Sequence, residues 1–251
     1  MKIIVGKSEN SMNHYAKNCI IDVIKTNDQP VLGLATGSTP VGMYQALIQA
    51  YRQGEVSFKD VTTFNLDEYV NLASDDPNSY RYFMNDQLFN HIDIQLDHTF
   101  VPNGNTTDHQ QACLDYEQEI DQHDHLDLQV LGIGTNGHIG FNEPGTSFES
   151  RTHVIELEPS TREANARFFA SLDDVPTHAI TMGIETIMES KAILLIARGA
   201  DKKQAVKELV DGKRSPDFPA SALKTHPRVT MLLDEAAASL LDDAAIYKKL
   251  D

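Results

Sequence analysis

The chain has 251 residues, of which 41% are hydrophobic, and it carries 21 Lys and Arg against 37 Asp and Glu, for a formal net charge of −16. This length fits one large domain or two small ones, and the hydrophobic fraction supports a core while excluding a membrane protein. The longest clean apolar run, residues 192–197, is far shorter than the ~20 residues of a transmembrane helix. A surface this acidic repels nucleic acid and anionic lipid, so we expect neither as a partner.

Strand-like and helix-like segments alternate along the chain. In the first half, apolar runs predict strands and helical spacing of apolar residues predicts helices. The strands are expected at 2–5, 31–35, 61–65, 99–101 and 126–131, and the helices at 8–26, 40–53, 78–90 and 105–122.

The alternation continues less regularly in the second half. Strands are expected at 153–157, 178–181, 191–197 and 229–233, helices at 161–169 and 201–210, and a helical tail rich in Asp, Glu and Ala after them. This order predicts an α/β fold with three α/β/α layers around a mainly parallel, Rossmann-like sheet. Because the chain shows no linker and no internal repeat, we expect a single domain over residues 1–251.

The first candidate site is the turn between the strand at 31–35 and the following helix. Residues 36–40, Thr-Gly-Ser-Thr-Pro, are called the anion loop. A helix N-terminus offers free N–H groups and the positive end of its dipole, and the hydroxyls of Ser38 and Thr39 beside Gly37 add donors. No Lys follows the last Gly, so this is not a Walker A motif. The alternative is an ordinary turn with Thr39 as N-cap.

The second candidate is a pair of adjacent carboxylates, Asp67 and Glu68, in the segment Phe-Asn-Leu-Asp-Glu-Tyr at 64–69. They follow a buried strand, and one can face a cleft while its neighbour points elsewhere. A carboxylate near apolar groups has a raised pKa and can abstract a carbon-bound proton. A solvated turn is the alternative.

The third candidate is the stretch at 132–144, called the glycine loop, which follows the strand at 126–131 and contains His138 and Glu143. An imidazole and a carboxylate at the carboxyl end of a strand indicate an active site. The spacing also matches the GxGxxG dinucleotide motif, but that motif needs a helix to begin within it, and Pro144 argues for a loop. Because glycines flank His138, it is not a packed core histidine.

The remaining candidates are two cations, a pair of histidines and two cysteines. Arg167 and Lys202 are expected to meet an anionic ligand, whereas Lys203 points into solvent. His123 and His125 superficially resemble a metal site, but an exposed acidic helix end explains them better; we expect no metal. The cysteines, Cys19 and Cys113, read as small apolar residues in a reducing cytoplasm.

Four ordered motifs resemble those of the glucosamine-6-phosphate deaminase family, also called glucosamine-6-phosphate isomerases, over essentially the whole chain. The motifs are Ala-Thr-Gly-Ser-Thr-Pro at 35–40, Phe-Asn-Leu-Asp-Glu-Tyr at 64–69, Gly-Thr-Asn-Gly-His-Ile-Gly-Phe-Asn-Glu-Pro at 134–144 and Ala-Asn-Ala-Arg-Phe-Phe at 164–169. The resemblance implies conversion of D-glucosamine 6-phosphate and water to D-fructose 6-phosphate and ammonia, without a metal or an organic cofactor.

The resemblance also implies roles for the candidate residues. His138 would open the sugar ring, with Glu143 orienting it, and Asp67 would then move a proton from C2 to C1. The phosphate would be held by Gly37, Ser38, Thr39, Arg167 and Lys202.

The chain departs from the best-known family pattern at two places. Many members have Asp where this chain has Asn136, so a hydrogen-bonding role is expected for Asn136. Members activated by N-acetylglucosamine 6-phosphate carry basic residues where this chain has His153 and Ile155. We therefore expect weak or absent allosteric activation and either a monomer or a homo-oligomer. Segment 145–180, called the lid segment, is expected to close over the site.

Two other functions are compatible with the same motifs. A 6-phosphogluconolactonase is a relative with a similar sheet, but its reaction needs no carbon base such as Asp67. A non-catalytic sugar-phosphate sensor would usually have lost Asp67, His138 or Glu143, and all three are present.

Overall fold

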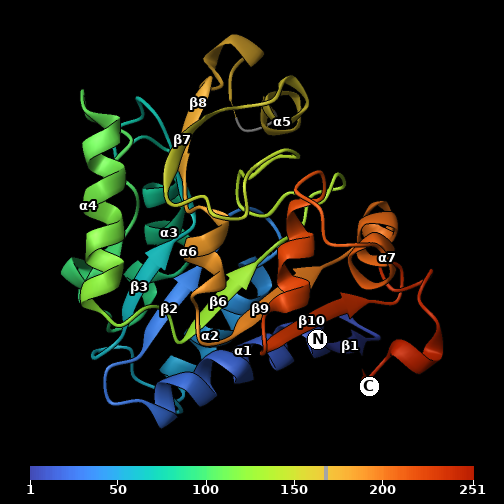
Figure 1. The fold of residues 1–251 in the computed structure, drawn as a ribbon. Helices are drawn as coiled ribbons and strands as arrows, with labels where there is room; N and C mark the ends of the chain where they lie inside the picture. The colour runs from blue at the N-terminus through green and yellow to red at the C-terminus, as the bar shows by residue number, and fades with distance from the viewer. Residues whose placement is uncertain (167–168) are drawn as a thin grey trace.

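The computed structural model describes residues 1–166 and 169–251 and contains a central eight-stranded sheet (Figure 1). Each of its strand pairings is parallel. This confirms the predicted mainly parallel sheet. In spatial order the strands are β11 (Lys248–Leu250), β1 (Lys2–Gly6), β10 (Val229–Asp234), β9 (Ile193–Ala197), β6 (Leu128–Leu131), β2 (Val31–Leu34), β3 (Thr62–Asn65) and β5 (Thr99–Phe100).

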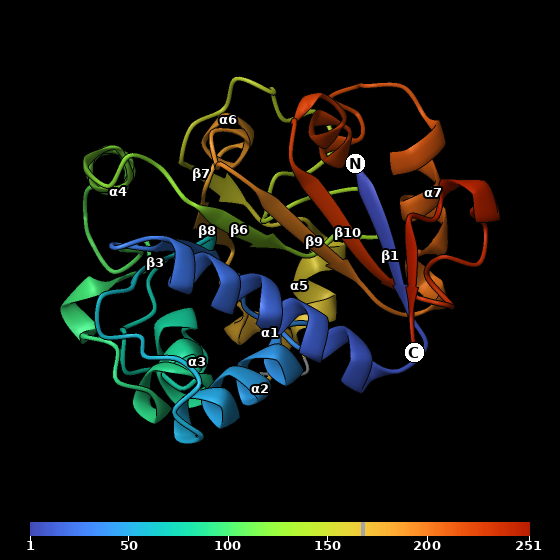
Figure 2. The same ribbon diagram turned by 90° about the horizontal axis from the view of Figure 1, so that it is seen from below.

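Helices cover both faces of this sheet. Figure 2 shows α1 and α2 on one face and α6 and α7 on the other, which confirms the three-layer α/β/α prediction. The helices are α1 (Glu9–Thr26), α2 (Val41–Arg52), α3 (Tyr80–Gln87), α4 (His109–Gln122), α5 (Pro159–Asn165), α6 (Ile184–Met188) and α7 (Lys203–Asp211).

Local capping explains where several helices start. Ser8 and Ser11 form a capping box at the start of α1, whose inner face buries Met12 and Ile20. Ser79 caps α3, and Asp108 caps α4 through a hydrogen bond to the backbone of Gln111. The fourth helix therefore begins at His109, not at 105 as predicted, because the acidic cap fixes its first turn.

A second, three-stranded antiparallel sheet was not predicted. It consists of β4 (Asp67–Tyr69), β8 (His178–Thr181) and β7 (His153–Glu156), in that order. Figure 1 shows β7, β8 and α5 beyond one end of the central sheet. A small apolar cluster that includes Tyr69, Phe141 and Leu157 packs beside this sheet. The segment that carries Asp67 is therefore a strand, and the alternative of a solvated turn is wrong.

The predicted helical tail is wrong. After β10 the chain makes turns, a 3-10 turn at Asp243–Ala245 and then β11, which pairs with β1. The Asp, Glu and Ala composition favours a helix locally. The free edge of β1 offers backbone groups that need partners, and Tyr247 donates its N–H to the carbonyl of Ile3.

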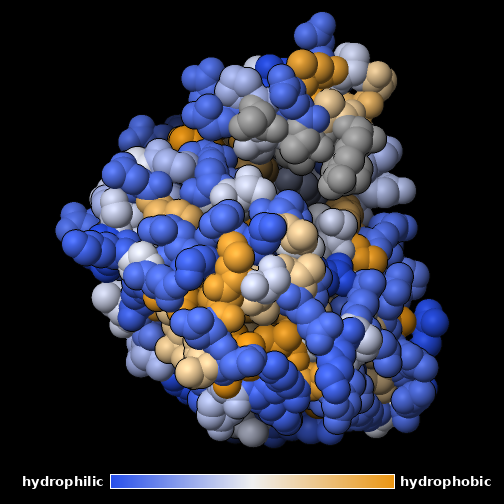
Figure 3. All heavy atoms as spheres, turned by 90° about the vertical axis from the view of Figure 1, so that its right-hand side faces the viewer, coloured by the Kyte–Doolittle hydropathy of each residue, from blue (hydrophilic) through white to orange (hydrophobic). Residues whose placement is uncertain are grey.

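The surface is largely polar. Figure 3 shows hydrophilic side chains over most of one face, with apolar atoms in smaller groups, as the net charge of −16 would suggest. Within residues 1–166 and 169–251, no helix has both the length and the apolar character that crossing a membrane requires.

Candidate active site

Parallel pairing brings the candidate segments to one edge of the central sheet. Strands β3, β2, β6 and β9 are neighbours in that order, and their carboxyl ends lie at the same edge. The segments that follow them contain Asp67, the anion loop, the glycine loop and Lys202. Open α/β sheets bind small ligands at this edge.

The anion loop has free donors. The N–H groups of Gly37, Ser38 and Thr39 have no hydrogen-bond acceptor among the described residues, and Gly37 adopts a φ of +84°. The loop leads into α2, whose N-cap is Pro40 without any side-chain cap. The alternative in which Thr39 caps this helix is therefore wrong. Three consecutive unbonded N–H groups at a helix N-terminus form an anion-binding concavity.

Asp67 and Glu68 have different environments although they are adjacent. Glu68 accepts hydrogen bonds from the backbone N–H groups of Tyr69, Tyr80 and Arg81, so it holds the first turn of α3. Asp67 is only 7% exposed, and burial, with a smaller contribution from the Glu68 charge, raises the pKa of its carboxyl to about 8. One carboxylate of the pair therefore has a structural role, and the other has the pKa of a proton carrier near neutral pH.

The glycine loop approaches Asp67 at Gly140. Gly140 has a φ of +57°, and a Cβ there would lie 3.7 Å from Asp67 Oδ2 and 2.9 Å from Thr181 Oγ1. Chain reversal within the loop includes a bridge between Ile139 and Asn142. No helix begins between residues 132 and 152. The loop therefore lacks the helix that the dinucleotide motif requires.

His138 lies against the backbone of Gly134. A Cβ at Gly134 would lie 2.3 Å from the ring atoms Cε1 and Nδ1 of His138, so no larger residue fits without moving the ring. His138 Nδ1 lies 3.4 Å from Glu143 Oε1. This distance suits an ion pair when the imidazole is protonated.

Glu143 is held by two further side chains. Asn136 Nδ2 donates to Glu143 Oε2 at 2.7 Å, and Thr161 Oγ1 donates to Oε1 at 3.1 Å. Burial pushes the pKa of Glu143 upward, but the contacts with His138, Asn136 and Thr161 outweigh it, and the net shift is downward. Glu143 is therefore an anion at neutral pH, placed to orient an imidazole and stabilise its cation.

The predicted cations are placed differently. Lys202 ends a 3-10 turn just before α7, and its Nζ lies 3.4 Å from Asp201 Oδ2. Arg167 lies outside the described residues.

The sequence analysis did not identify Arg198, whose guanidinium contacts the anion loop. Its position directly after the buried strand expected at 191–197 could have indicated it. The sequence analysis also did not identify Thr161, because no local sequence pattern indicates its hydrogen bond to Glu143.

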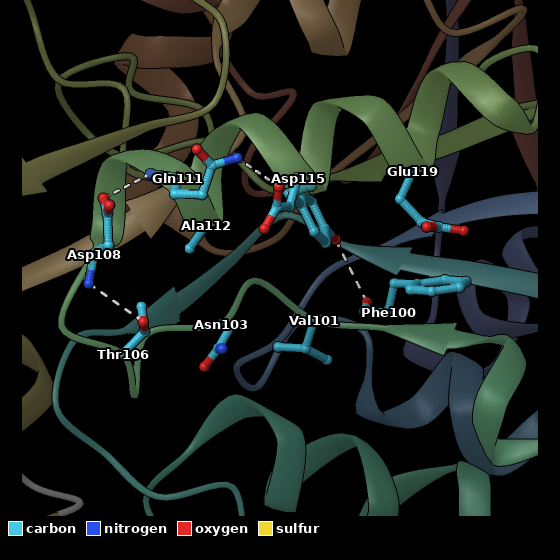
Figure 4. A pocket seen from close by; sticks show the side chains of 10 residues that line it. Phe100, Val101, Asn103, Thr106, Asp108, Gln111, Ala112, Asp115 and Glu119 are labelled. Atoms are coloured by element: carbon cyan, nitrogen blue, oxygen red, sulfur yellow. Dashed lines mark hydrogen bonds between the residues drawn. The ribbon is translucent and has the colours of Figure 1, made fainter.

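A separate cavity of about 310 Å³ lies between α4 and the chain at 100–108 (Figure 4). Its wall includes Asp108, Asp115 and Glu119, and Gln111 is hydrogen-bonded to Asp115 along α4. Carboxylates repel an anionic ligand, and none of the candidate residues lines this cavity. In the described part of the chain, no group of three or more His, Cys, Asp or Glu side chains is arranged to hold a metal ion.

The chain is similar to one known protein family and to several known proteins. The family model of glucosamine-6-phosphate isomerases/6-phosphogluconolactonase matches residues 7–232. A glucosamine-6-phosphate deaminase of Oceanobacillus iheyensis is 55% identical over 94% of this chain and 95% of its own length. Glucosamine-6-phosphate deaminase 1 of Bacillus subtilis is 52% identical, over 96% and 99%.

A solved structure of a monomeric glucosamine-6-phosphate deaminase is also similar. It superposes with a TM-score of 0.92 and is 52% identical, covering 96% of this chain and 100% of that one. The residues matched by the family model, 7–232, include the strands β2, β3, β6 and β9 that precede the site segments. The chain therefore belongs to the glucosamine-6-phosphate isomerase/6-phosphogluconolactonase family.

Proposed function

We propose that this protein is a glucosamine-6-phosphate deaminase, which converts D-glucosamine 6-phosphate and water to D-fructose 6-phosphate and ammonia. The observation that carries the proposal is the buried Asp67 beside Gly140, on the same sheet edge as the His138–Glu143 pair and the anion loop. The names of the relatives that are more than 50% identical over nearly the full chain support it.

The substrate phosphate binds at the anion loop. The free N–H groups of Gly37, Ser38 and Thr39 and the N-terminal end of α2 favour an anion there. Lys202 supplies positive charge from the turn that follows β9. Arg167 is proposed as a further phosphate partner on the strength of the sequence resemblance. Binding at the unreactive end of the sugar then fixes the position of C1 and C2.

Ring opening is assigned to His138. The imidazole takes the proton of the O1 hydroxyl and a proton is returned to the ring oxygen O5, which yields the open-chain aldehyde. Glu143 holds Nδ1 and stabilises the imidazolium during this step, and Asn136 keeps Glu143 in place.

Isomerisation and deamination are assigned to Asp67. Its carboxylate removes the proton from C2 to give an enolate, whose O1 takes a proton from water to form an enolamine. Asp67 then delivers its proton to C1, and the resulting iminium at C2 returns an N–H proton to the hydroxide, which leaves an imine. Water adds to that imine carbon and ammonia departs, giving the ketone of fructose 6-phosphate. A pKa of about 8 lets Asp67 both accept and release a proton near neutral pH.

We further propose that the lid segment closes over the substrate. Its described parts include β7, α5 and most of β8, which lie beyond the end of the central sheet in Figure 1, and Thr161 of α5 donates a hydrogen bond to Glu143. Closure excludes water while the ring opens. We also propose that the protein is a cytoplasmic, single-domain monomer. A monomer is supported by the similar solved structure, which is described as a monomeric glucosamine-6-phosphate deaminase. The cytoplasm is supported by the two free cysteines, because thiols stay reduced there.

One assay tests the proposed reaction. The purified protein is incubated with glucosamine 6-phosphate and a chelator, and ammonium and fructose 6-phosphate are both measured. The proposal requires the two products in equal amounts, with activity unchanged by the chelator. Hydrolysis of 6-phosphogluconolactone without ammonium from the amino sugar would indicate the lactonase instead, and phosphosugar binding without turnover would indicate a sensor.

A further inference from the structure

Arg198 is the cation in contact with the anion loop, and the mechanism above gives it no role. It follows the last residue of β9, while the anion loop follows β2, and β6 lies between these two strands. Arg198 Nη2 lies 3.3 Å from the carbonyl oxygen of Ser38 and 3.2 Å from that of Thr39. Its side chain therefore spans the end of β6 and ties two loops of the site together.

The two carbonyl contacts fix which way the loop amides face. In a trans peptide the C=O of one residue and the N–H of the next point to opposite sides, and the described chain has no cis peptide bond. Holding the Ser38 carbonyl toward the guanidinium therefore turns the N–H of Thr39 away from it. The Thr39 carbonyl precedes Pro40, which has no N–H, so this second contact removes no donor from the loop.

The other side of the guanidinium is also held. Nη1 donates to the carboxylate of Glu9, the first residue of α1, and only 22% of the Arg198 side chain is exposed. A planar fork reaches these three oxygens at once, from α1 on one side and from the anion loop on the other. A lysine has one compact ammonium and cannot hold the three in the same geometry.

We propose that Arg198 is a positioning residue for the phosphate end of the substrate. It fixes the carbonyls of Ser38 and Thr39 so that the free N–H groups of residues 37–39 converge on the phosphate, and Glu9 holds it in that posture. This inference rests on the proposed function, because the anion loop is taken as the phosphate site.

The decisive comparison is between Arg198→Lys, which keeps the positive charge, and wild type. Titration calorimetry measures the Kd of inorganic phosphate, and steady-state assays give KM and kcat for glucosamine 6-phosphate. We expect Arg198→Lys to raise both the phosphate Kd and KM by about 10-fold while kcat changes less than threefold. Arg52→Lys, at the exposed far end of α2, is the matched control and should leave all three values unchanged.

Glu9→Ala separates positioning from simple charge attraction. If Arg198 acts by holding the loop, loss of its Glu9 partner weakens phosphate binding, by about threefold. If Arg198 acts only through its charge, loss of a nearby anion tightens phosphate binding instead. Tighter binding by Glu9→Ala, or a wild-type Kd and KM in Arg198→Lys, would overturn the proposal. Thermal unfolding by circular dichroism shows that each variant is folded.

The two levels of proposal fail in different ways. If wild type releases no ammonium from glucosamine 6-phosphate, the proposed function fails, whatever the variants do. If wild type is active and binds phosphate while Arg198→Lys behaves identically, only the positioning role of Arg198 fails.

Discussion

Glu68 and Asp67 are consecutive residues of β4, yet backbone N–H groups hold the Glu68 carboxylate at the start of α3 while the Asp67 carboxylate lies beside Gly140 of the glycine loop. Alternation along a strand sends adjacent side chains to opposite faces. The Glu68 carboxylate therefore stabilises the fold, and the Asp67 carboxylate is the one that we propose for the chemistry.

Substitution of Asp67 by Asn should abolish ammonia release. The amide cannot accept the C2 proton, so we expect kcat to fall by at least about 10³-fold, at the upper part of the range for a positioned base. The proposed phosphate site is the anion loop, so the Kd for phosphate should stay within twofold of wild type. Kinetics and phosphate calorimetry on the same preparation check both, and retained turnover would remove Asp67 from the mechanism.

Glu68→Gln is the neighbouring comparison and should behave in the opposite way. In the variant, the amide nitrogen replaces a carboxylate oxygen that accepted a hydrogen bond from a backbone N–H. That N–H loses its acceptor, which lowers the free energy of unfolding by about 1–3 kcal/mol. We expect a lower melting temperature with substantial activity retained below it. Loss of activity without loss of stability would contradict the division between the two carboxylates.

The pKa of Asp67 predicts a pH dependence of both activity and stability. The base must be ionised, so kcat/KM should rise with pH up to about 8 as Asp67 loses its proton. Stability should change with pH in the opposite direction and fall as pH rises. The folded state holds the proton between the unfolded value of roughly 3.9 and about 8, so this group favours folding at low pH and the contribution is lost as pH rises through that window. Urea unfolding from pH 5 to 9 should show this fall in wild type and a shallower one in Asp67→Asn.

Gly134→Ala tests whether the position of the His138 ring against Gly134 is needed for activity. A Cβ at this position would lie 2.3 Å from the ring, so the imidazole must shift from its present position 3.4 Å from Glu143, and we expect kcat to fall by about 100-fold. Gly132→Ala is a control in the same loop, because a Cβ there meets nothing within 4 Å. It should remain near wild type in kcat. Equal effects of the two substitutions would mean that loop entropy, not the position of the ring, controls the rate.

The rate should depend hyperbolically on substrate. The sequence resemblance places His153 and Ile155 at the strand positions where activated family members are expected to carry basic residues. We therefore expect a Hill coefficient near 1 that N-acetylglucosamine 6-phosphate leaves unchanged. A sigmoidal curve that becomes hyperbolic with this compound would contradict the prediction.

The main sheet could be read from the sequence because its strands are buried on both sides and appear as short apolar runs, such as residues 193–197. Strand β4 could not, because Asp67, Glu68 and Tyr69 owe their extended form to pairing with β8, more than a hundred residues away. The tail after Asp234 was misread for the same reason: its final strand forms by pairing with β1 at the other end of the chain.

The site follows a similar division. The anion loop and the glycine loop could be found in the sequence as turns, rich in glycine and hydroxyl residues, that follow strands. Such turns are recognisable because their local backbone geometry alone favours these residue types. Contacts made across the fold left no local mark, as with Arg198 on the carbonyl of Ser38 and Thr161 on Glu143. Sequence patterns therefore located the loops, but not the side chains that hold them in place.

The partners of β1 have a consequence for biosynthesis. This strand lies between β10 and β11, so residues 2–6 are synthesised long before residues 229–250, which are their neighbours in the sheet. Contacts that close so large a loop form slowly. We therefore expect residues 2–6 to remain without their sheet partners during synthesis until residues 229–250 have left the ribosome, and to pair with them slowly thereafter.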